Sequence, residues 1–203
     1  MALVPLLKAH IINAEDIIID AKSGVTGAGR NAKKSLLFCE LHENFYPYKV
    51  GMHQHTPEII RYLNEHSATP VDLHLTTQLL PVKRGISMSI YPRLSAESAA
   101  LSVPALTEKI ATAYETAYEN YSLVRYGNLA QANAAQSLQL TGLSKVVGSC
   151  RTHIAYQVVG KGIVIFSTLD NLLKGAASQA VENLNHLQGW AVDTGLTSVE
   201  GLL

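Results

Sequence analysis

The sequence predicts an α+β (α/β) fold in which helices pack on a mixed, largely antiparallel sheet. Three observations support this prediction. Isoleucines 17–19 form a β-branched run that is typical of a buried strand. Apolar runs at 153–159 and 163–168 flank Gly160-Lys161-Gly162, which predicts a β-hairpin. Residues 103–121 repeat apolar side chains at helical spacing, so an amphipathic helix is expected there.

Shorter signals predict the remaining elements. Thr56 and Pro57 favour a helix start, with threonine as the N-cap and proline at the first helical position. The polar stretch 126–144 is interpreted as a loop with one strand edge, and the tail from 191 shows no element. In chain order the other elements are a helix at 2–10, a strand at 17–20, a helix from 56, strands at 71–79 and 86–94, and a helix at 172–187 that ends at Gly189.

Length and composition bound the class of protein. The chain has 203 residues, enough for one domain or two, and its 47% hydrophobic content excludes a disordered chain. Lys plus Arg and Asp plus Glu both number 16, and zero net charge offers no electrostatic footprint for nucleic acid or an anionic membrane. No apolar run reaches the roughly 18 residues of a membrane span, and the N-terminus lacks a signal-peptide pattern. Two cysteines, Cys39 and Cys150, make no disulfide framework, which favours the reducing cytoplasm.

The content of charged residues is low. They make up 16% of the chain, against about 25% in an average soluble domain. One interpretation is that a partner chain or a missing domain normally covers part of the surface. The other is a surface rich in Ser, Thr, Asn and Gln, and composition alone favours neither.

A glycine-rich segment, Asp20 to Arg30, follows the first predicted strand. Its glycines allow main-chain N–H groups to converge on an anion, while Lys22, Ser23 and Arg30 add positive charge and a hydroxyl donor. The spacing matches neither GxGxxG nor a Walker A loop, so it is no nucleotide fingerprint. The alternative interpretation is a flexible surface turn.

The segment from His53 to Glu58, HQHTPE, stands just before a predicted helix. Histidines one residue apart point to opposite sides of an extended segment, so His53 and His55 are not expected to chelate one metal. Glu58 is expected to reach back from the first helical turn and orient a histidine, which suits a general acid/base near pH 7. A helix cap with polar neighbours is the alternative. No Cys or Asp cluster completes a metal site, and none is expected.

Two further clusters carry charge. Lys83-Arg84-Gly85 precedes a predicted strand, and Arg84 suits a bidentate clamp on carboxylate or phosphate, or else is an ordinary solvated charge. The segment 170–179, DNLLKGAASQ, joins a strand to a helix. Its small residues admit the close approach of a ligand, or else serve tight helix packing.

Taken in order, the four clusters resemble the C-terminal part of the N-acetyl-gamma-glutamyl-phosphate reductase family, which is related to aspartate-semialdehyde dehydrogenase. The resemblance extends over nearly the whole chain. The segments that carry it are IIIDAKSGVTGAGR (17–30), YKVGMHQHTPEI (48–59), LLPVKRGI (79–86), VVGS (146–149) and DNLLKGAASQAVENLN (170–185).

The resemblance implies a Rossmann nucleotide domain followed by a mixed-sheet domain, and the chain matches only the second. Residues 1–169 would form a catalytic and dimerisation domain, with 170–203 a C-terminal helix and tail that pack on the absent nucleotide-binding domain. It further implies NADP as cofactor, a small acyl phosphate as substrate, a homo-oligomer (dimer or tetramer) and a cytoplasmic location. The family's cysteine nucleophile lies in a Gly-Cys-Tyr-Pro-Thr-like motif that is not in this sequence. The chain alone is therefore expected to be inactive.

The resemblance also assigns candidate site residues, with His53 as the acid/base and Asn171 near the nicotinamide amide. Two positions depart from the family, since Gln54 stands where arginine is common and Cys150 where asparagine is common. The candidate catalytic residues are His53, His55, Glu58 and Tyr48. The candidate substrate-binding residues are Arg30, Arg84 and Ser23. The candidate cofactor-binding residues are Ser23, Gly24, Asn171 and Lys174.

Two functions fit these observations. In the first, the chain is the C-terminal portion of the reductase, and the complete enzyme does the chemistry. In the second, it is a non-catalytic dimerisation module that pairs with a separate nucleotide-binding chain.

Overall fold

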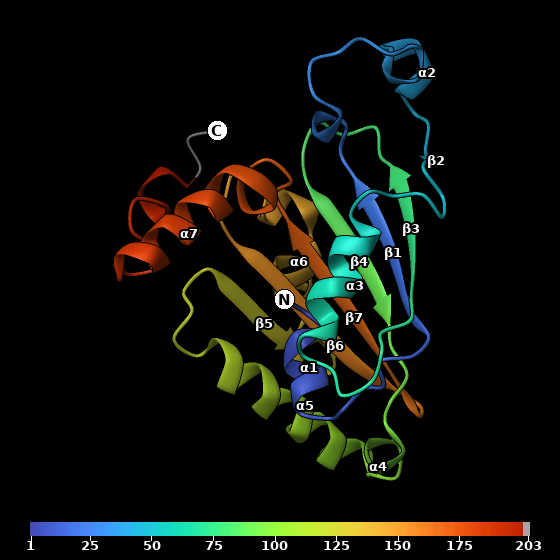
Figure 1. Ribbon diagram of the computed structural model, residues 1–203, viewed down its shortest axis with the longest axis vertical. Coiled ribbons are helices and arrows are strands. Elements are labelled where there is room, and N and C mark those ends of the chain that lie inside the picture. The colour runs from blue at the N-terminus through green and yellow to red at the C-terminus, as the bar shows by residue number, and fades with distance from the viewer. Residues whose placement is uncertain (201–203) are drawn as a thin grey trace.

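The computed structural model describes residues 1–200 and contains one seven-stranded sheet (Figure 1). Its strands are β1 (Ile17–Ser23), β2 (Tyr46–Pro47), β3 (Leu73–Leu79), β4 (Ile86–Tyr91), β5 (Val124–Asn128), β6 (Thr152–Val159) and β7 (Gly162–Leu169). Their order in the sheet is β2-β3-β1-β4-β7-β6-β5. The pairs β1–β3 and β5–β6 are parallel and the other four are antiparallel. This confirms the expected mixed, largely antiparallel sheet.

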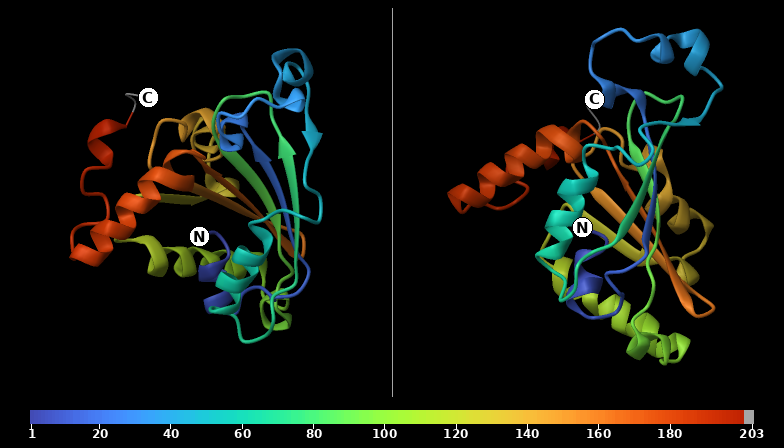
Figure 2. Two further views of the ribbon diagram at one scale, coloured as in Figure 1. Left: turned by 45° about the horizontal axis from the view of Figure 1, so that its top comes forward. Right: turned by 45° about the vertical axis from the view of Figure 1, so that its right-hand side comes forward.

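Helices pack on both faces of the sheet, but unequally. They are α1 (Val4–Lys8), α2 (Phe38–Leu41), α3 (Thr56–Asn64), α4 (Ala96–Ala99), α5 (Val103–Tyr118), α6 (Ala134–Thr141) and α7 (Ser178–Gln188). Helices α1, α3 and α5 lie on one face, and α6 lies on the other (Figures 1 and 2). Helix α7 extends away from the end of the sheet where β7 finishes (Figure 2).

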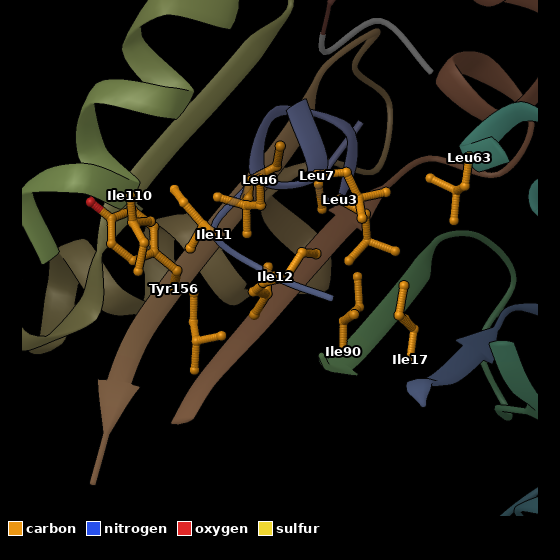
Figure 3. Packing of buried hydrophobic residues seen from close by; sticks show 14 of the residues in the cluster. Leu3, Leu6, Leu7, Ile11, Ile12, Ile17, Leu63, Ile90, Ile110 and Tyr156 are labelled. Carbon is orange, nitrogen blue, oxygen red and sulfur yellow. The ribbon is translucent and has the colours of Figure 1, made fainter. Parts of the chain in front are cut away.

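The face under α1, α3 and α5 carries the main hydrophobic core. Ile17 on β1 and Ile90 on β4 meet Leu6 of α1, Leu63 of α3 and Ile110 of α5 in one buried cluster (Figure 3). Tyr114 of α5 is also buried there, and its hydroxyl donates a hydrogen bond to the main-chain oxygen of Ala2 at 2.8 Å. Burial of each such side chain contributes about 1.5–3 kcal/mol, so these contacts fix the helices on this face.

Strand β1 runs through the middle of the sheet, but only one of its faces is buried. Ile17 and Ile19 are in the core, whereas Ile18 points to the other face and is 46% exposed. The prediction of a strand at 17–20 is confirmed, and its expected burial on both sides is wrong at Ile18. The reason is that no helix among the described residues covers the far face of β1.

On that far face, α6 covers only the strands β5 to β7. The Leu140 side chain of α6 packs against Gly127 of β5, and the His153 ring of β6 bonds the Gln139 main-chain oxygen at 2.9 Å. The rest of this face, on β3, β1 and β4, is uncovered by the described residues (Figure 2). We call it the open face; its register-matched residues are Ile18, Asp20, Lys22, His74, Thr76, Gln78, Ser87, Ser89 and Tyr91.

Several expected boundaries needed correction. In the stretch 126–144 the expected strand edge is confirmed as the end of β5, but the expected loop is wrong, because it contains α6, which begins with a reciprocal capping box between Asn133 and Gln136. Helix α3 has His55 rather than Thr56 at its N-cap, and no side chain caps it. The helix expected at 172–187 begins as a π-helix, Leu173–Ala177, before α7 and ends as expected, with Gly189 left-handed at φ 68°. The hairpin at Gly160 is confirmed as β6 and β7.

Candidate functional site

Most of the candidate residues lie beside one row of paired strand residues at one end of the sheet. Ser23, the last residue of β1, pairs with Leu79 of β3 and Ile86 of β4, while Ile86 also pairs with Leu169 of β7. Leu79 in turn pairs with Tyr46 of β2. The glycine-rich loop, the Arg84 turn and the segment from Asp170 all adjoin this row, so the topology brings three distant sequence clusters to one end of the sheet (Figure 1). The His53 segment follows β2, which runs away from the row: the Tyr48 N–H donates to the Thr77 carbonyl, two residues before Leu79.

The glycine-rich loop is joined to the Arg84 turn by its main chain. The N–H groups of Gly24, Val25 and Thr26 donate to the carbonyls of residues 85, 82 and 83 at 2.8, 3.0 and 3.1 Å. The Thr26 hydroxyl adds a bond to the Lys83 carbonyl at 2.8 Å. Our expectation that these N–H groups converge on an anion is therefore wrong, because each is spent within the fold.

Gly24 is required by close packing. A Cβ built at this position would lie 2.9 Å from main-chain atoms of Lys83 and Arg84, which cannot rotate away. Ser23 sits beside it, and its hydroxyl donates to the Gly24 carbonyl at 3.0 Å. Arg30 lies at the exposed end of the loop. Of the three substrate or cofactor candidates on this loop, only Arg30 therefore presents an unspent group to solvent among the described residues.

Substituting Gly24 by alanine is expected to lower the free energy of unfolding by about 1–3 kcal/mol, the usual effect of overpacking. Urea unfolding at 25 °C measures it. The matched control is Gly27→Ala, whose added Cβ meets only Asn171 Nδ2 at 3.6 Å. That control should be neutral or slightly stabilising, because alanine lowers the entropy of the unfolded chain. Equal effects of the two substitutions would contradict the packing argument.

Asn171 links the glycine-rich loop to the Arg84 turn. Its Oδ1 accepts from the Gly85 N–H at 2.7 Å, and its Nδ2 donates to the Thr26 hydroxyl at 3.0 Å. The side chain is buried. These two bonds make Asn171 a structural bridge between the two loops. One Nδ2 hydrogen remains for a ligand.

Arg84 lies against the buried carboxylate of Asp170. Its Nη1 is 3.8 Å from Asp170 Oδ2, and that nitrogen is buried with no hydrogen-bond acceptor among the described residues. Asp170 is itself bound by the N–H groups of Gly148, Leu172 and Leu173 at 2.8–3.0 Å. A guanidinium held in place with an unpaired N–H is suited to bind an anion. The sequence shows Asp170 only as an acid between a strand and a helix, which is a capping signal.

Lys174 belongs to a separate ion pair, away from Arg84 and Asp170. Its ammonium is buried and bonds both carboxylate oxygens of Glu182 on α7, at 2.6 and 2.5 Å. The Tyr121 hydroxyl also donates to Glu182, and its ring lies 5.4 Å from the Lys174 nitrogen. The position of Lys174 therefore gives no support to the expected cofactor contact, since its charge is neutralised inside the fold. The role of Glu182 and Tyr121 was not expected from the sequence.

The His53 segment is a tight turn rather than an extended strand. Lys49 and Gly51 have positive φ values of 48° and 69°, which fold the chain back before α3. The rings of His53 and His55 are consequently only 5.1 Å apart, and His53 Nδ1 accepts the His55 main-chain N–H at 3.3 Å. The expectation that the two histidines point to opposite sides is therefore wrong.

The surroundings of His53 set its protonation state. Burial, followed by the charges of His55 and Lys49, lowers the pKa of His53 below its usual value. Tyr48 lies edge-on to His53 with ring centres 5.8 Å apart, and burial raises its pKa. No hydrogen bond or ion pair among the described residues joins Glu58 to His53, so the expected orientation of the ring by Glu58 finds no support here.

Residues 1–200 contain neither a metal-binding cluster nor a membrane-spanning helix. No group of three or more His, Cys, Asp or Glu side chains in that range is arranged to hold a metal ion. No helix in the same range is both long enough and apolar enough to cross a membrane.

Solved structures define the class of this fold. Aspartate-semialdehyde dehydrogenase from Francisella tularensis superposes with a TM-score of 0.65, at 16% identity, covering 92% of this chain and 61% of that one. Aspartate-semialdehyde dehydrogenase II from Vibrio cholerae gives a TM-score of 0.54 at 16% identity, covering 88% of this chain and 56% of that one. The chain belongs to the family described as the semialdehyde dehydrogenase dimerisation domain, whose model matches residues 1–171.

Curated relatives narrow the comparison further. N-acetyl-gamma-glutamyl-phosphate reductase from Streptococcus thermophilus is 40% identical over 198 residues, which is 97% of this chain and 53% of that protein. The reductase of the same name from Desulfotalea psychrophila is 40% identical, covering 98% of this chain and 54% of the relative. The chain thus spans about half the length of the curated relatives it matches.

Proposed function

We propose that the chain is the C-terminal portion of an NADP-dependent N-acetyl-gamma-glutamyl-phosphate reductase. The complete enzyme would convert N-acetylglutamyl phosphate to N-acetylglutamate 5-semialdehyde in arginine biosynthesis, in the cytoplasm. The observation that carries the proposal is the 40% identity to reductases of that name along 97% of this chain. The gathering of three candidate clusters at one end of the sheet supports it.

The proposed roles divide between two parts of the site. Arg84, with its unpaired buried nitrogen, and the exposed Arg30 would hold the anionic groups of the substrate, beside Ser23. His53 would act at the reacting carbon in its neutral form, which its lowered pKa favours. Tyr48, His55 and Glu58 would shape its surroundings.

The residues assigned to the cofactor fit NADP poorly. The Gly24 N–H, one amide hydrogen of Asn171 and the Lys174 ammonium are all spent on partners within the chain, and the Ser23 hydroxyl bonds a carbonyl. We therefore propose that NADP, which would supply the hydride, is held almost entirely by the half of the enzyme that this chain does not contain.

We propose that a second copy of the chain covers the open face. The family description as a dimerisation domain supports this, and the face combines exposed Ile18 and Tyr91 with polar side chains that pair internally. Asp20, for example, accepts bonds from both Lys22 and Gln78. An isologous interface needs such a self-complementary surface.

Substituting Ile18 by lysine is expected to weaken self-association at least tenfold, because the interface would bury an unpaired ammonium. Sedimentation at several concentrations measures the dimer dissociation constant. Tyr62→Lys is the matched control, since Tyr62 is similarly exposed but lies on α3, on the opposite face. A wild-type chain that stays monomeric at every concentration, or equal effects of both substitutions, would contradict the proposed interface.

Helix α7 offers a second apolar surface. Val181, Leu184 and Leu187 recur at helical spacing and are exposed, Leu187 to 83%, and Trp190 follows just beyond the helix. Exposed apolar stripes of this kind mark interaction sites. We propose that the nucleotide-binding half of the enzyme covers this stripe, which is consistent with the expected role of residues 170–203.

The purified chain alone is expected to form no NADPH from NADP, phosphate and N-acetylglutamate 5-semialdehyde, whereas its fusion to the N-terminal half of the Streptococcus thermophilus reductase should do so. The reason is that the thioester step needs a cysteine nucleophile supplied by that half. Absorbance of NADPH reports turnover. A fusion that is stably folded yet inactive would favour the non-catalytic dimerisation module. NADPH formation by the chain alone would contradict the proposal that the N-terminal half supplies the nucleophile.

A further inference from the structure

The turn before α3 contains a hydrogen bond that constrains the His53 ring. His53 Nδ1 lies 3.3 Å from the main-chain nitrogen of His55, whose N–H points at it. His55 is the N-cap residue of α3, a helix of nine residues, so this N–H belongs to the first unsatisfied donors of the helix. We propose that the main-chain N–H of His55 is a positioning group that fixes neutral His53 in the tautomer carrying its proton on Nε2.

The assignment follows from the chemistry of the ring. A neutral imidazole has one nitrogen with a hydrogen and one with a lone pair. An N–H donor can face only the lone pair, so Nδ1 must be bare and Nε2 must carry the hydrogen. Protonating Nδ1 would place two hydrogens against each other and break the bond to His55.

The neighbours of His53 favour the neutral ring. Lys49 and His55 are the charged or titratable groups that act on it, Tyr48 meets it edge-on, and the Lys49 ammonium is held across the turn by Gln54 Oε1 at 3.3 Å. The positive end of the α3 dipole opposes a further positive charge at the same point. The hydrogen bond and the surrounding charges therefore both favour the neutral ring of His53.

The locked tautomer narrows what His53 can do. The tautomer is inferred from the structure alone. The inference that its Nε2–H acts on a substrate oxygen rests on the proposed function. Neutral His53 has no lone pair on Nε2 and cannot remove a proton there. It instead offers an Nε2–H hydrogen bond to a substrate oxygen that gains negative charge during the reaction, and no proton needs to move.

Nitrogen-15 NMR of the histidine-labelled chain at neutral pH tests the proposal. We expect wild-type His53 to show a protonated Nε2 and a bare Nδ1, assigned by loss of the signals in His53→Gln. His55→Pro removes the N–H, and His55→Ala removes only the ring. The alanine variant should keep the single tautomer, while the proline variant should return to the averaging of free imidazole, with a higher His53 pKa than the alanine variant.

A protonated Nδ1 in the wild-type chain would overturn the proposal, and so would identical spectra of folded proline and alanine variants. The wild-type measurement needs no substitution, so a proline variant that does not fold leaves the proposal open to refutation. The NMR signals are also independent of turnover. A fixed Nε2–H tautomer in a fusion that does not reduce the acyl phosphate would refute the proposed function and leave the tautomer assignment standing.

Discussion

Replacing His53 by asparagine in the fusion enzyme is expected to lower kcat by about 10²–10³, the usual range for loss of one hydrogen-bond donor to a developing oxyanion. The ring is expected to act at the reacting carbon and not on the cofactor, so the loss should fall on kcat while the KM for NADPH stays near its original value. Steady-state rates with varied substrate and varied NADPH separate the two effects.

His55→Asn is the matched comparison for this prediction. It keeps the main-chain N–H that His53 Nδ1 accepts, and it removes a ring that is itself exposed. Its effect on kcat should therefore be much smaller. Near-normal turnover in His53→Asn together with complete loss in His55→Asn would show that the two roles are assigned the wrong way round.

Replacing Glu182 by alanine is expected to lower the free energy of unfolding by about 3–5 kcal/mol, which is typical of a broken buried ion pair. Lys174 would be left as a buried charge, and the Tyr121 hydroxyl would lose its acceptor. The ion pair is inside the fold, with Lys174 3% exposed and Glu182 0% exposed. Urea unfolding followed by circular dichroism measures the loss.

A paired substitution separates the charge from the packing. Lys174→Met with Glu182→Leu replaces both charges by apolar groups, and its stability should lie much closer to that of the wild-type chain. Lys109 and Glu97 form an ion pair at the surface, so Glu97→Ala should change stability by less than about 1 kcal/mol. A Glu182→Ala loss no larger than that of Glu97→Ala would contradict the argument.

Strong local signals made most of the fold predictable. The hairpin was readable because Gly160 and Gly162 interrupt two apolar runs, and α5 because its apolar residues recur at helical spacing. Helix α6 was missed because it is short and none of its residues is buried. Its one clear signal was the pair Asn133 and Gln136, three residues apart, which forms the capping box.

The candidate clusters were visible in the sequence, but the contacts between them were not. The glycine-rich loop and the Arg84 turn were both identified, yet the bond from the Gly24 N–H to the Gly85 carbonyl joins residues far apart in sequence, and no local pattern shows such pairing. For the same reason, the loss of free N–H donors could not be foreseen. Lys174 was expected to bind the cofactor, whereas its ammonium is paired with Glu182, which lies eight residues later.

The central position of β1 bears on how the chain is made. Both neighbours of β1, β3 and β4, are encoded later, so Ile17–Ile19 must leave the ribosome without a strand to pair with. The segment up to β4 takes on the order of several seconds to synthesise at about 5–20 residues per second. During that interval this β-branched run has no strand partner, so its main-chain groups are open to pairing with other chains. The acidic residues at 15, 16 and 20, which flank the three isoleucines, place negative charge on both sides of this run while it waits for its partners.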